Sequence, residues 1–223
     1  MVNKGGITMN EPKKTKSNEV SKFSDILLLG EFKFVMTILL SAFAFTRYAL
    51  MPDRIHELCF WAMIFSTAGD LCMMNHLGIP SYTFKGKQFY AGVIFFAIAH
   101  IFYRQMFKNA LPEPISWGIG ETTCLLLLLV FLTVINLCKL KKNSVFNMAT
   151  GLYTGLIFSN LAAATNCAYY LGGKYVFAFM GVLCFIISDF FLLVRETYKN
   201  KPIIRKLVWI FYPLAQILII GNV

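Results

Sequence analysis

The sequence predicts an all-α protein, a polytopic bundle of transmembrane helices, and three observations support this class. The 223 residues are 57% hydrophobic and only 14% charged, whereas soluble domains average about 25% charged residues. Apolar runs of about 18 or more residues follow one another along most of the chain. These runs are continuously apolar rather than alternating, which argues against a transmembrane β-barrel.

Seven membrane spans are predicted, and together they form one transmembrane domain over residues 32–223. Residues 1–31 are polar and rich in lysine, so we expect a disordered tail without a signal peptide. Short loops that carry proline or glycine, such as "MPDR", "NALPEP" and "LGGK", separate several apolar runs. The predicted spans cover residues 32–50, 55–75, 88–107, 115–138, 145–170, 175–195 and 203–221.

The basic residues predict the orientation of this bundle. If the chain crosses seven times, 16 of its 21 lysine and arginine residues lie on the side of the N-terminal tail. The other side holds the remaining five, which are Arg47, Arg54, Arg104, Lys108 and Lys174. Because positively charged loops stay in the cytoplasm, we expect a cytoplasmic N-terminus and a C-terminus outside. The net charge of +10 is therefore attributed to membrane orientation, and no nucleic-acid partner is expected.

Two aspartates interrupt the apolar runs at corresponding positions. Asp70 lies in "IFSTAGDLCMMN" near the end of the second span, and Asp189 lies in "CFIISDFFLLV" near the end of the sixth. Both spans run toward the cytoplasm, so the two carboxyl groups lie at nearly the same depth. An ionisable residue within a span is costly and usually faces a cavity or a partner. We therefore expect the two aspartates to form one site, with a purely structural hydrogen-bonded pair as the alternative.

Further polar residues recur on single faces of several predicted helices, as expected of a polar pocket inside a lipid-facing shell. For the tyrosines the alternative is an interfacial anchor, and for the amides it is a hydrogen bond between helices. No metal site is expected, because one interior histidine and scattered acids lack the spacing of metal ligands. The candidate substrate-binding residues are His100, Tyr103, Tyr153, Asn160, Ser188, Tyr212 and Gln216.

Four segments, in this order, resemble the YhhN family of integral membrane proteins. The resemblance covers about residues 60–220. The family usually has eight spans, and the present chain has one fewer before the helix of Asp70. The segments are the pair Gly69-Asp70, "FYAGVIFFAIAHIFY" from Phe89 to Tyr103, "GVLCFIISDFFLLVR" with Ser188 and Asp189, and "FYPLAQILI" with Tyr212, Ala215 and Gln216.

This resemblance implies a membrane-embedded hydrolase, because the characterised animal members of the family are lysoplasmalogenases. Such an enzyme cleaves the vinyl ether of an alkenyl lysophospholipid and releases a fatty aldehyde and a glycerophospho-alcohol. The reaction needs a proton donor and a group that stabilises an oxocarbenium-like cation, and two carboxyl groups can supply both. The resemblance thus suggests Asp70 and Asp189 as the catalytic pair, with no metal or other cofactor.

The expected partners are a lysophospholipid substrate and the lipid bilayer around a multi-pass protein. The membrane is a bacterial plasma membrane, or the endoplasmic reticulum if the source is eukaryotic. A small transporter or proton-coupled carrier is the alternative function, since it would also bury paired acids. The sequence leaves the oligomeric state open.

Overall fold

The computed structural model describes residues 34–74, 87–113, 117–140, 143–197 and 202–223, and the regular structure in these ranges is helical. The predicted disordered tail lies outside the described residues. Each of the seven predicted spans coincides with one helix, which confirms the all-α class. The helices are Phe34–Leu50, α2 (Arg54–Met74), α4 (Lys87–Ala110), α5 (Ile119–Leu137), α6 (Ser144–Leu171), α7 (Lys174–Thr197) and α8 (Pro202–Gly221).

Four of these helices are long and apolar enough to cross a membrane, namely α4, α5, α7 and α8. Helix α6 carries many more polar residues, including several threonines and asparagines. It packs against α4, α5 and α7. Its buried Asn160 and Asn166 bond to α4 and α5, and its threonines bond to main-chain oxygens of α6 itself. Membrane crossing by α2, α6 and the helix Phe34–Leu50 stays a prediction.

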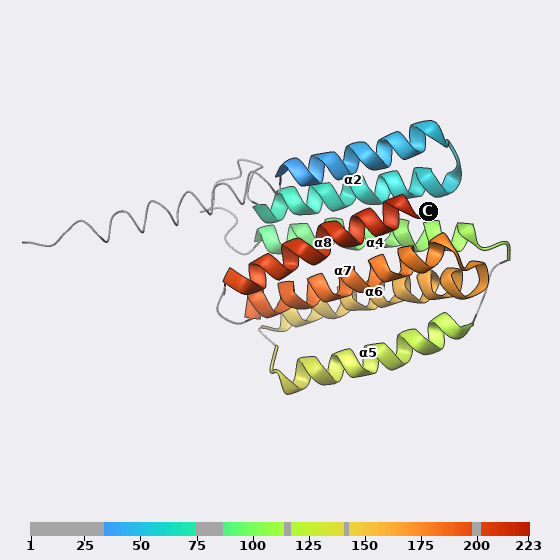
Figure 1. The fold of residues 1–223 in the computed structure, drawn as a ribbon. Coiled ribbons are helices and arrows are strands. Elements are labelled where there is room, and N and C mark those ends of the chain that lie inside the picture. The colour runs from blue at the N-terminus through green and yellow to red at the C-terminus, as the bar shows by residue number, and fades with distance from the viewer. Residues whose placement is uncertain (1–33, 75–86, 114–116, 141–142, 198–201) are drawn as a thin grey trace, which may run out of the picture.

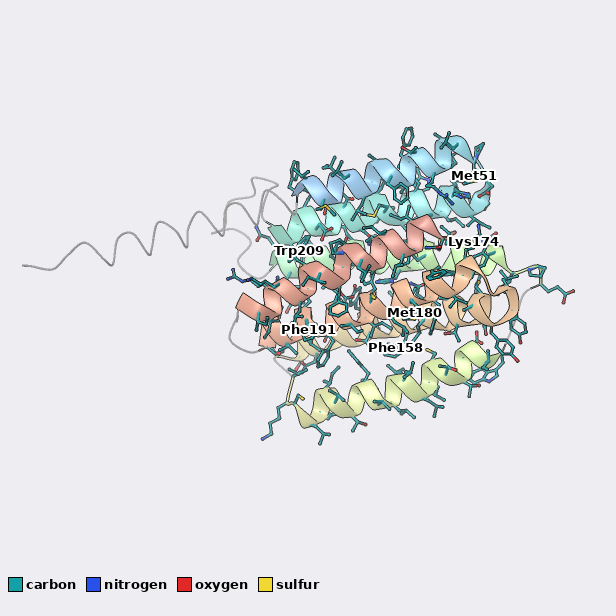
Figure 2. All side chains as sticks on the ribbon, in the orientation of Figure 1. Met51, Phe158, Lys174, Met180, Phe191 and Trp209 are labelled. Carbon is teal, nitrogen blue, oxygen red and sulfur yellow. The ribbon has the colours of Figure 1, made fainter. Side chains whose placement is uncertain are left out.

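The helices lie roughly parallel to one axis and alternate in direction (Figure 1). The helix Phe34–Leu50 lies at one edge of the bundle and α5 at the opposite edge. We call the end at which α4 begins the Lys87 end, and the end at which it finishes the Ala110 end. Met51 and Lys174 lie near the Ala110 end, whereas Trp209 and Phe191 lie toward the Lys87 end (Figure 2).

Two glycines let α2 and α4 approach closely. A Cβ atom added to Gly69 would lie 2.9 Å from the ring of Phe96, and one added to Gly92 would lie 2.7 Å from the side chain of Met73. Both distances are far below van der Waals contact, so neither position has room for a side chain. The glycine before Asp70 therefore has a packing role, because it brings the helix of Asp70 against α4.

Large apolar side chains cover the outside of the bundle. Leu126 and Val130 of α5 are 61% and 60% exposed, and Ile94 of α4 and Ile210 of α8 are similarly exposed. A soluble monomer rarely exposes so much contiguous apolar surface, whereas lipid-facing helices do. The polar residues with functional potential consequently lie between the helices.

Candidate functional site

The first polar centre surrounds Asp70 of α2, whose side chain is 6% exposed. Its Oδ2 atom accepts hydrogen bonds from the Tyr212 hydroxyl at 2.6 Å and from Thr37 Oγ1 at 3.0 Å. Both donors are also buried, Thr37 on the helix Phe34–Leu50 and Tyr212 on α8. Two hydroxyl donors on one oxygen stabilise a carboxylate, and in this case they also tie three helices together.

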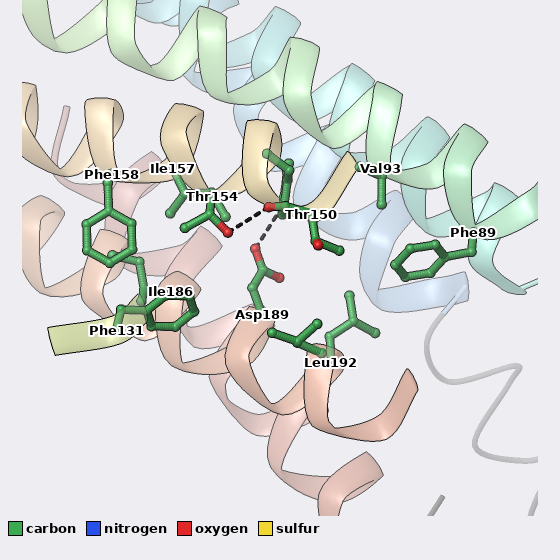
Figure 3. A pocket seen from close by; sticks show the side chains of 12 residues that line it. Phe89, Val93, Phe131, Thr150, Thr154, Ile157, Phe158, Ile186, Asp189 and Leu192 are labelled. Carbon is green, nitrogen blue, oxygen red and sulfur yellow. Dashed lines mark hydrogen bonds between the residues drawn. The ribbon is translucent and has the colours of Figure 1, made fainter. Parts of the chain in front are cut away.

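The second centre surrounds Asp189 of α7, which is less enclosed than Asp70. Its Oδ2 atom accepts a hydrogen bond from the Tyr153 hydroxyl of α6 at 2.7 Å. The carboxyl group points into a cavity of about 40 Å³ that Thr150 and Thr154 also line (Figure 3). Most of the lining is apolar, and a cavity of that size has room for water beside these few polar groups but not for a whole lysophospholipid.

A chain of hydrogen bonds leads from α6 through α4 to Asp189. Tyr153 has a single hydroxyl proton and donates it to Asp189, so the contact of 3.4 Å with His100 Nε2 requires the imidazole to donate. His100 Nδ1 then accepts from Asn160 Nδ2 at 3.3 Å. His100 and Asn160 are both almost fully buried. The donors therefore run in one direction, from Asn160 to His100, from His100 to Tyr153 and from Tyr153 to Asp189.

Aromatic rings lie between the two centres. The ring of Tyr212, which holds Asp70, packs edge-on against Phe185 with centroids 5.4 Å apart. Phe185 in turn packs against His100 at 4.7 Å, and His100 packs against Tyr153 at 5.6 Å. The cavity is lined by Asp189 and not by Asp70. A single site shared by both carboxyl groups therefore stays a prediction.

The two aspartates lie on the same half of the bundle. Asp70 comes four residues before the end of α2 and Asp189 eight residues before the end of α7. With 1.5 Å per residue, and with the two helix ends level, the depths differ by about one turn, or about 6 Å. The sequence-based expectation of similar depth therefore agrees with the fold to within one helical turn.

A family model described as the YhhN family matches residues 31–223. The chain belongs to the YhhN family. This confirms the resemblance drawn from the four sequence segments, and it extends the resemblance to nearly the whole chain. The family is associated with lysoplasmalogenase activity. The searches found no match among curated proteins and none among solved structures.

Three other predicted site residues of this YhhN protein make contacts between helices. The Tyr103 hydroxyl donates to Gln216 Oε1, and both side chains are fully buried. Ser188 Oγ donates to the main-chain oxygen of Val208 at 3.3 Å, which links α7 to α8. Substrate contact by Tyr103, Gln216 or Ser188 stays a prediction, and the visible role of each is to join helices.

Sequence reasoning did not find three residues of the two centres, Thr37, Thr150 and Thr154. Thr150 and Thr154 lie three residues before and one residue after Tyr153, so both lie within one helical turn of a residue already selected. Thr37 lies near the start of the first predicted span, at about the depth of Asp70. Thr37 could have been identified by comparing the depths of polar residues in different spans, in addition to their helical faces.

Metal ligands do not cluster in the described part of the chain, where no three histidine, cysteine or acidic side chains converge. The three buried cysteines, Cys59, Cys72 and Cys167, are free thiols. They behave as small apolar residues in the packing of the bundle.

Proposed function

We propose that this YhhN family member hydrolyses the vinyl ether bond of a lysoplasmalogen, with Asp189 as the proton donor and Asp70 as a charge-stabilising residue. The observation that carries this proposal is the carboxyl group of Asp189 at a small, mainly apolar cavity beside Tyr153. Acid-catalysed hydrolysis needs a proton donor and a water molecule, and a carboxyl group beside a water-sized space can supply both. Membership of the YhhN family supports the same chemistry.

In the first step, protonated Asp189 transfers its proton to the β-carbon of the vinyl ether. The carbon–carbon double bond supplies the electron pair, and an oxocarbenium ion forms at the ether oxygen and the α-carbon. Water then adds to the α-carbon and returns a proton to the Asp189 carboxylate. The resulting hemiacetal breaks its bond to the glycerol oxygen, which gives one fatty aldehyde and one glycerophospho-alcohol. The net reaction consumes one water molecule, and Asp189 ends in its starting state.

The Tyr153 hydrogen bond assists the first step because it strengthens as negative charge develops on Asp189. His100 and Asn160 orient the Tyr153 hydroxyl by donating along the same chain. A fixed donor of this kind requires no rearrangement when the proton leaves. Thr150 and Thr154 contribute hydroxyl oxygens to the cavity wall, where they can hold the attacking water.

Asp70 contributes a negative charge that opposes the positive charge of the oxocarbenium ion. Thr37 and Tyr212 both donate hydrogen bonds to its Oδ2 atom. Its effect does not require direct contact, because charges interact over longer distances in a medium of low dielectric constant than in water. In this proposal the two aspartates therefore differ in role, although they lie on the same half of the bundle.

The test uses purified protein with a lysoplasmalogen and with an acyl lysophospholipid of the same headgroup. Free aldehyde and free fatty acid are both quantified. We expect aldehyde from the alkenyl substrate and no fatty acid from the acyl substrate. Absence of aldehyde, or release of fatty acid at a comparable rate, would refute the proposed function.

The same reaction in heavy water tests the chemical step. Protonation of the β-carbon by a solvent-exchangeable group places one deuterium on the carbon next to the aldehyde. Mass spectrometry of the trapped aldehyde should therefore show one added deuterium per molecule. An aldehyde without deuterium at that carbon would exclude protonation by Asp189 as the first step.

A further inference from the structure

A groove lies between α4 and α5 toward the Ala110 end of the bundle. Helices α4 and α5 each pack against α6, with little or no contact between them. The groove has a volume of about 220 Å³, and its floor is formed by small residues of α6 that include Ser159 and Ala162. No residue of the groove belongs to the Asp70 or Asp189 centre.

One wall of the groove carries two positive charges. Arg104 and Lys108 lie one turn apart on α4, and neither forms an ion pair or a hydrogen bond with the described residues. The single acid in the lining is Glu121. Its Oε2 atom accepts from the Gly118 main-chain N–H at 2.8 Å and from Asn166 Nδ2 at 3.0 Å. Glu121 is thus hydrogen-bonded within the protein and also attracts Lys108, but two cations against one carboxylate leave the groove with a net positive charge.

The opposite wall is apolar. Leu125 and Leu128 of α5 line it, and Leu125 is 49% exposed. Trp117, which precedes α5, also lines the groove and is 69% exposed. Tryptophan at the end of an apolar helix is typical of the membrane interface, where lipid headgroups lie. The groove therefore offers a cationic wall and an apolar wall at the level of an interface.

We propose that this groove binds a glycerophospholipid, with its phosphodiester between Arg104 and Lys108 and the start of one chain along Leu125 and Leu128. The phosphodiester matches the two unpaired cations. A small soluble anion would match the cations but would leave the leucine wall unused. A neutral lipid would use the leucines but would leave the cations unpaired.

This lipid is distinct from the proposed substrate. Arg104 lies 17 residues from the start of α4, or about 26 Å from the Lys87 end, whereas Asp189 lies about 12 Å from that end. The separation of about 14 Å along the axis exceeds the few bonds between a phosphate and an sn-1 ether oxygen. A phosphate in this groove therefore does not place a vinyl ether at Asp189. Lipid binding in this groove does not depend on whether the protein is an ether hydrolase.

The test is a binding titration of delipidated protein in detergent, followed by native mass spectrometry. The ligands are phosphatidylglycerol, diacylglycerol with the same chains, and soluble glycerol phosphate. The variant Arg104→Gln/Lys108→Gln removes the two cations. The control Arg54→Gln/Lys174→Gln removes two charges from the same end of the bundle but outside the groove.

We expect the double variant of the groove to bind phosphatidylglycerol about 25-fold more weakly than the wild type, since each cation contributes about fivefold. The control should bind like the wild type, and diacylglycerol and glycerol phosphate should bind much more weakly. Equal loss in both double variants, or equal binding of diacylglycerol, would overturn the proposal. Tight binding of glycerol phosphate would instead indicate a site for a soluble anion. If the double variant does not fold, Lys108→Gln alone should still show a loss of about fivefold.

Discussion

The Asp70 and Asp189 centres place the same side chain on two helices that run in the same direction, yet they surround it differently. Asp70 is buried and receives two hydroxyl donors that come from two other helices. Asp189 is partly exposed, receives one donor and borders a cavity. Asp70 is therefore set to hold helices together, whereas Asp189 is the acid that the proposed mechanism uses as proton donor.

The difference lies in what each hydrogen-bond network can do. The donors of Asp70 are Thr37 and Tyr212, whose positions depend on the packing of three helices. The donors that lead to Asp189 form a line through Tyr153 and His100, and the line ends at a cavity with room for water. Loss of the first network should therefore affect folding most, and loss of the second should affect turnover most.

The largest expected effect is on turnover in Asp189→Asn. Removing a general acid typically costs a factor of about 10² to 10⁴, and we expect a loss in this range for aldehyde release from lysoplasmalogen. Asp70→Asn keeps an oxygen that can accept from Tyr212 but removes the negative charge. Its loss should be about tenfold, which corresponds to a weaker, through-space effect.

Both asparagine variants should fold, because asparagine has nearly the same shape as aspartate. Their thermal unfolding in detergent is the control for that expectation. If Asp70→Asn loses as much activity as Asp189→Asn while both stay folded, the two carboxyl groups act as an equal pair, and the distinction between the centres is wrong.

The second effect concerns stability. Here the substitution at Asp70 should be the more damaging one, whereas for turnover it is the substitution at Asp189. Asp70→Ala leaves two buried hydroxyl groups without their acceptor, whereas Asp189→Ala leaves only the Tyr153 hydroxyl, which lines a cavity where water can accept its proton. At about 1 kcal/mol per lost hydrogen bond, Asp70→Ala should cost about 2 kcal/mol and Asp189→Ala about 1 kcal/mol or less.

The measurement follows the reaction of a thiol-specific dye with the buried cysteines Cys59 and Cys167 during heating. Unfolding exposes these thiols, so the midpoint of dye reaction reports the stability of the bundle. A lower midpoint for Asp189→Ala than for Asp70→Ala would contradict the structural role given to Asp70.

The fold could be predicted from the sequence to a large extent, because apolar runs fix the number and length of helices in a bundle of this kind. The largest error at a helix start concerns α5, which was expected from residue 115 and begins at Ile119. The Glu121 side chain accepts from the main-chain N–H of Gly118 and thereby caps the helix there. A capping contact of this kind is a local signal that hydropathy alone does not contain.

The candidate site could be predicted only in part. Helical periodicity placed Tyr153 and Asn160 on one face of α6, and the structure brings both to His100. Periodicity does not say which helices are neighbours. The donors of Asp70 lie 33 and 142 residues away in the sequence, and only the packing of the whole bundle brings them together. For that reason the separate surroundings of the two aspartates were not foreseen.

The third effect compares the two tyrosines. Tyr153→Phe removes the donor that stabilises the carboxylate of Asp189 after proton transfer, so turnover should fall about tenfold. Tyr212→Phe removes one of the two donors to Asp70, so stability should fall by about 1 kcal/mol while turnover changes by less than about threefold.

Steady-state kinetics separates these outcomes from a change in substrate binding. In Tyr153→Phe the loss should lie in kcat, with KM nearly unchanged, because the hydrogen bond acts on the developing charge rather than on the substrate. A loss confined to KM would mean that Tyr153 binds the lysophospholipid, and the chain of donors would have no catalytic part.

The smallest effects are expected from the threonines, where a single hydroxyl group is removed from the Asp70 centre or from the Asp189 centre. Thr37→Val keeps the shape of the side chain and removes a donor to Asp70, so we expect a loss of about 0.6 kcal/mol in stability and unchanged turnover. Thr154→Val removes a hydroxyl from the wall of the cavity beside Asp189, so we expect a loss of about threefold in turnover with stability nearly unchanged. Both variants are measured by the same cysteine-dye melt and aldehyde assay. If Thr37→Val slowed turnover more than Thr154→Val did, the chemistry would lie nearer Asp70, and the cavity beside Asp189 would not hold the attacking water.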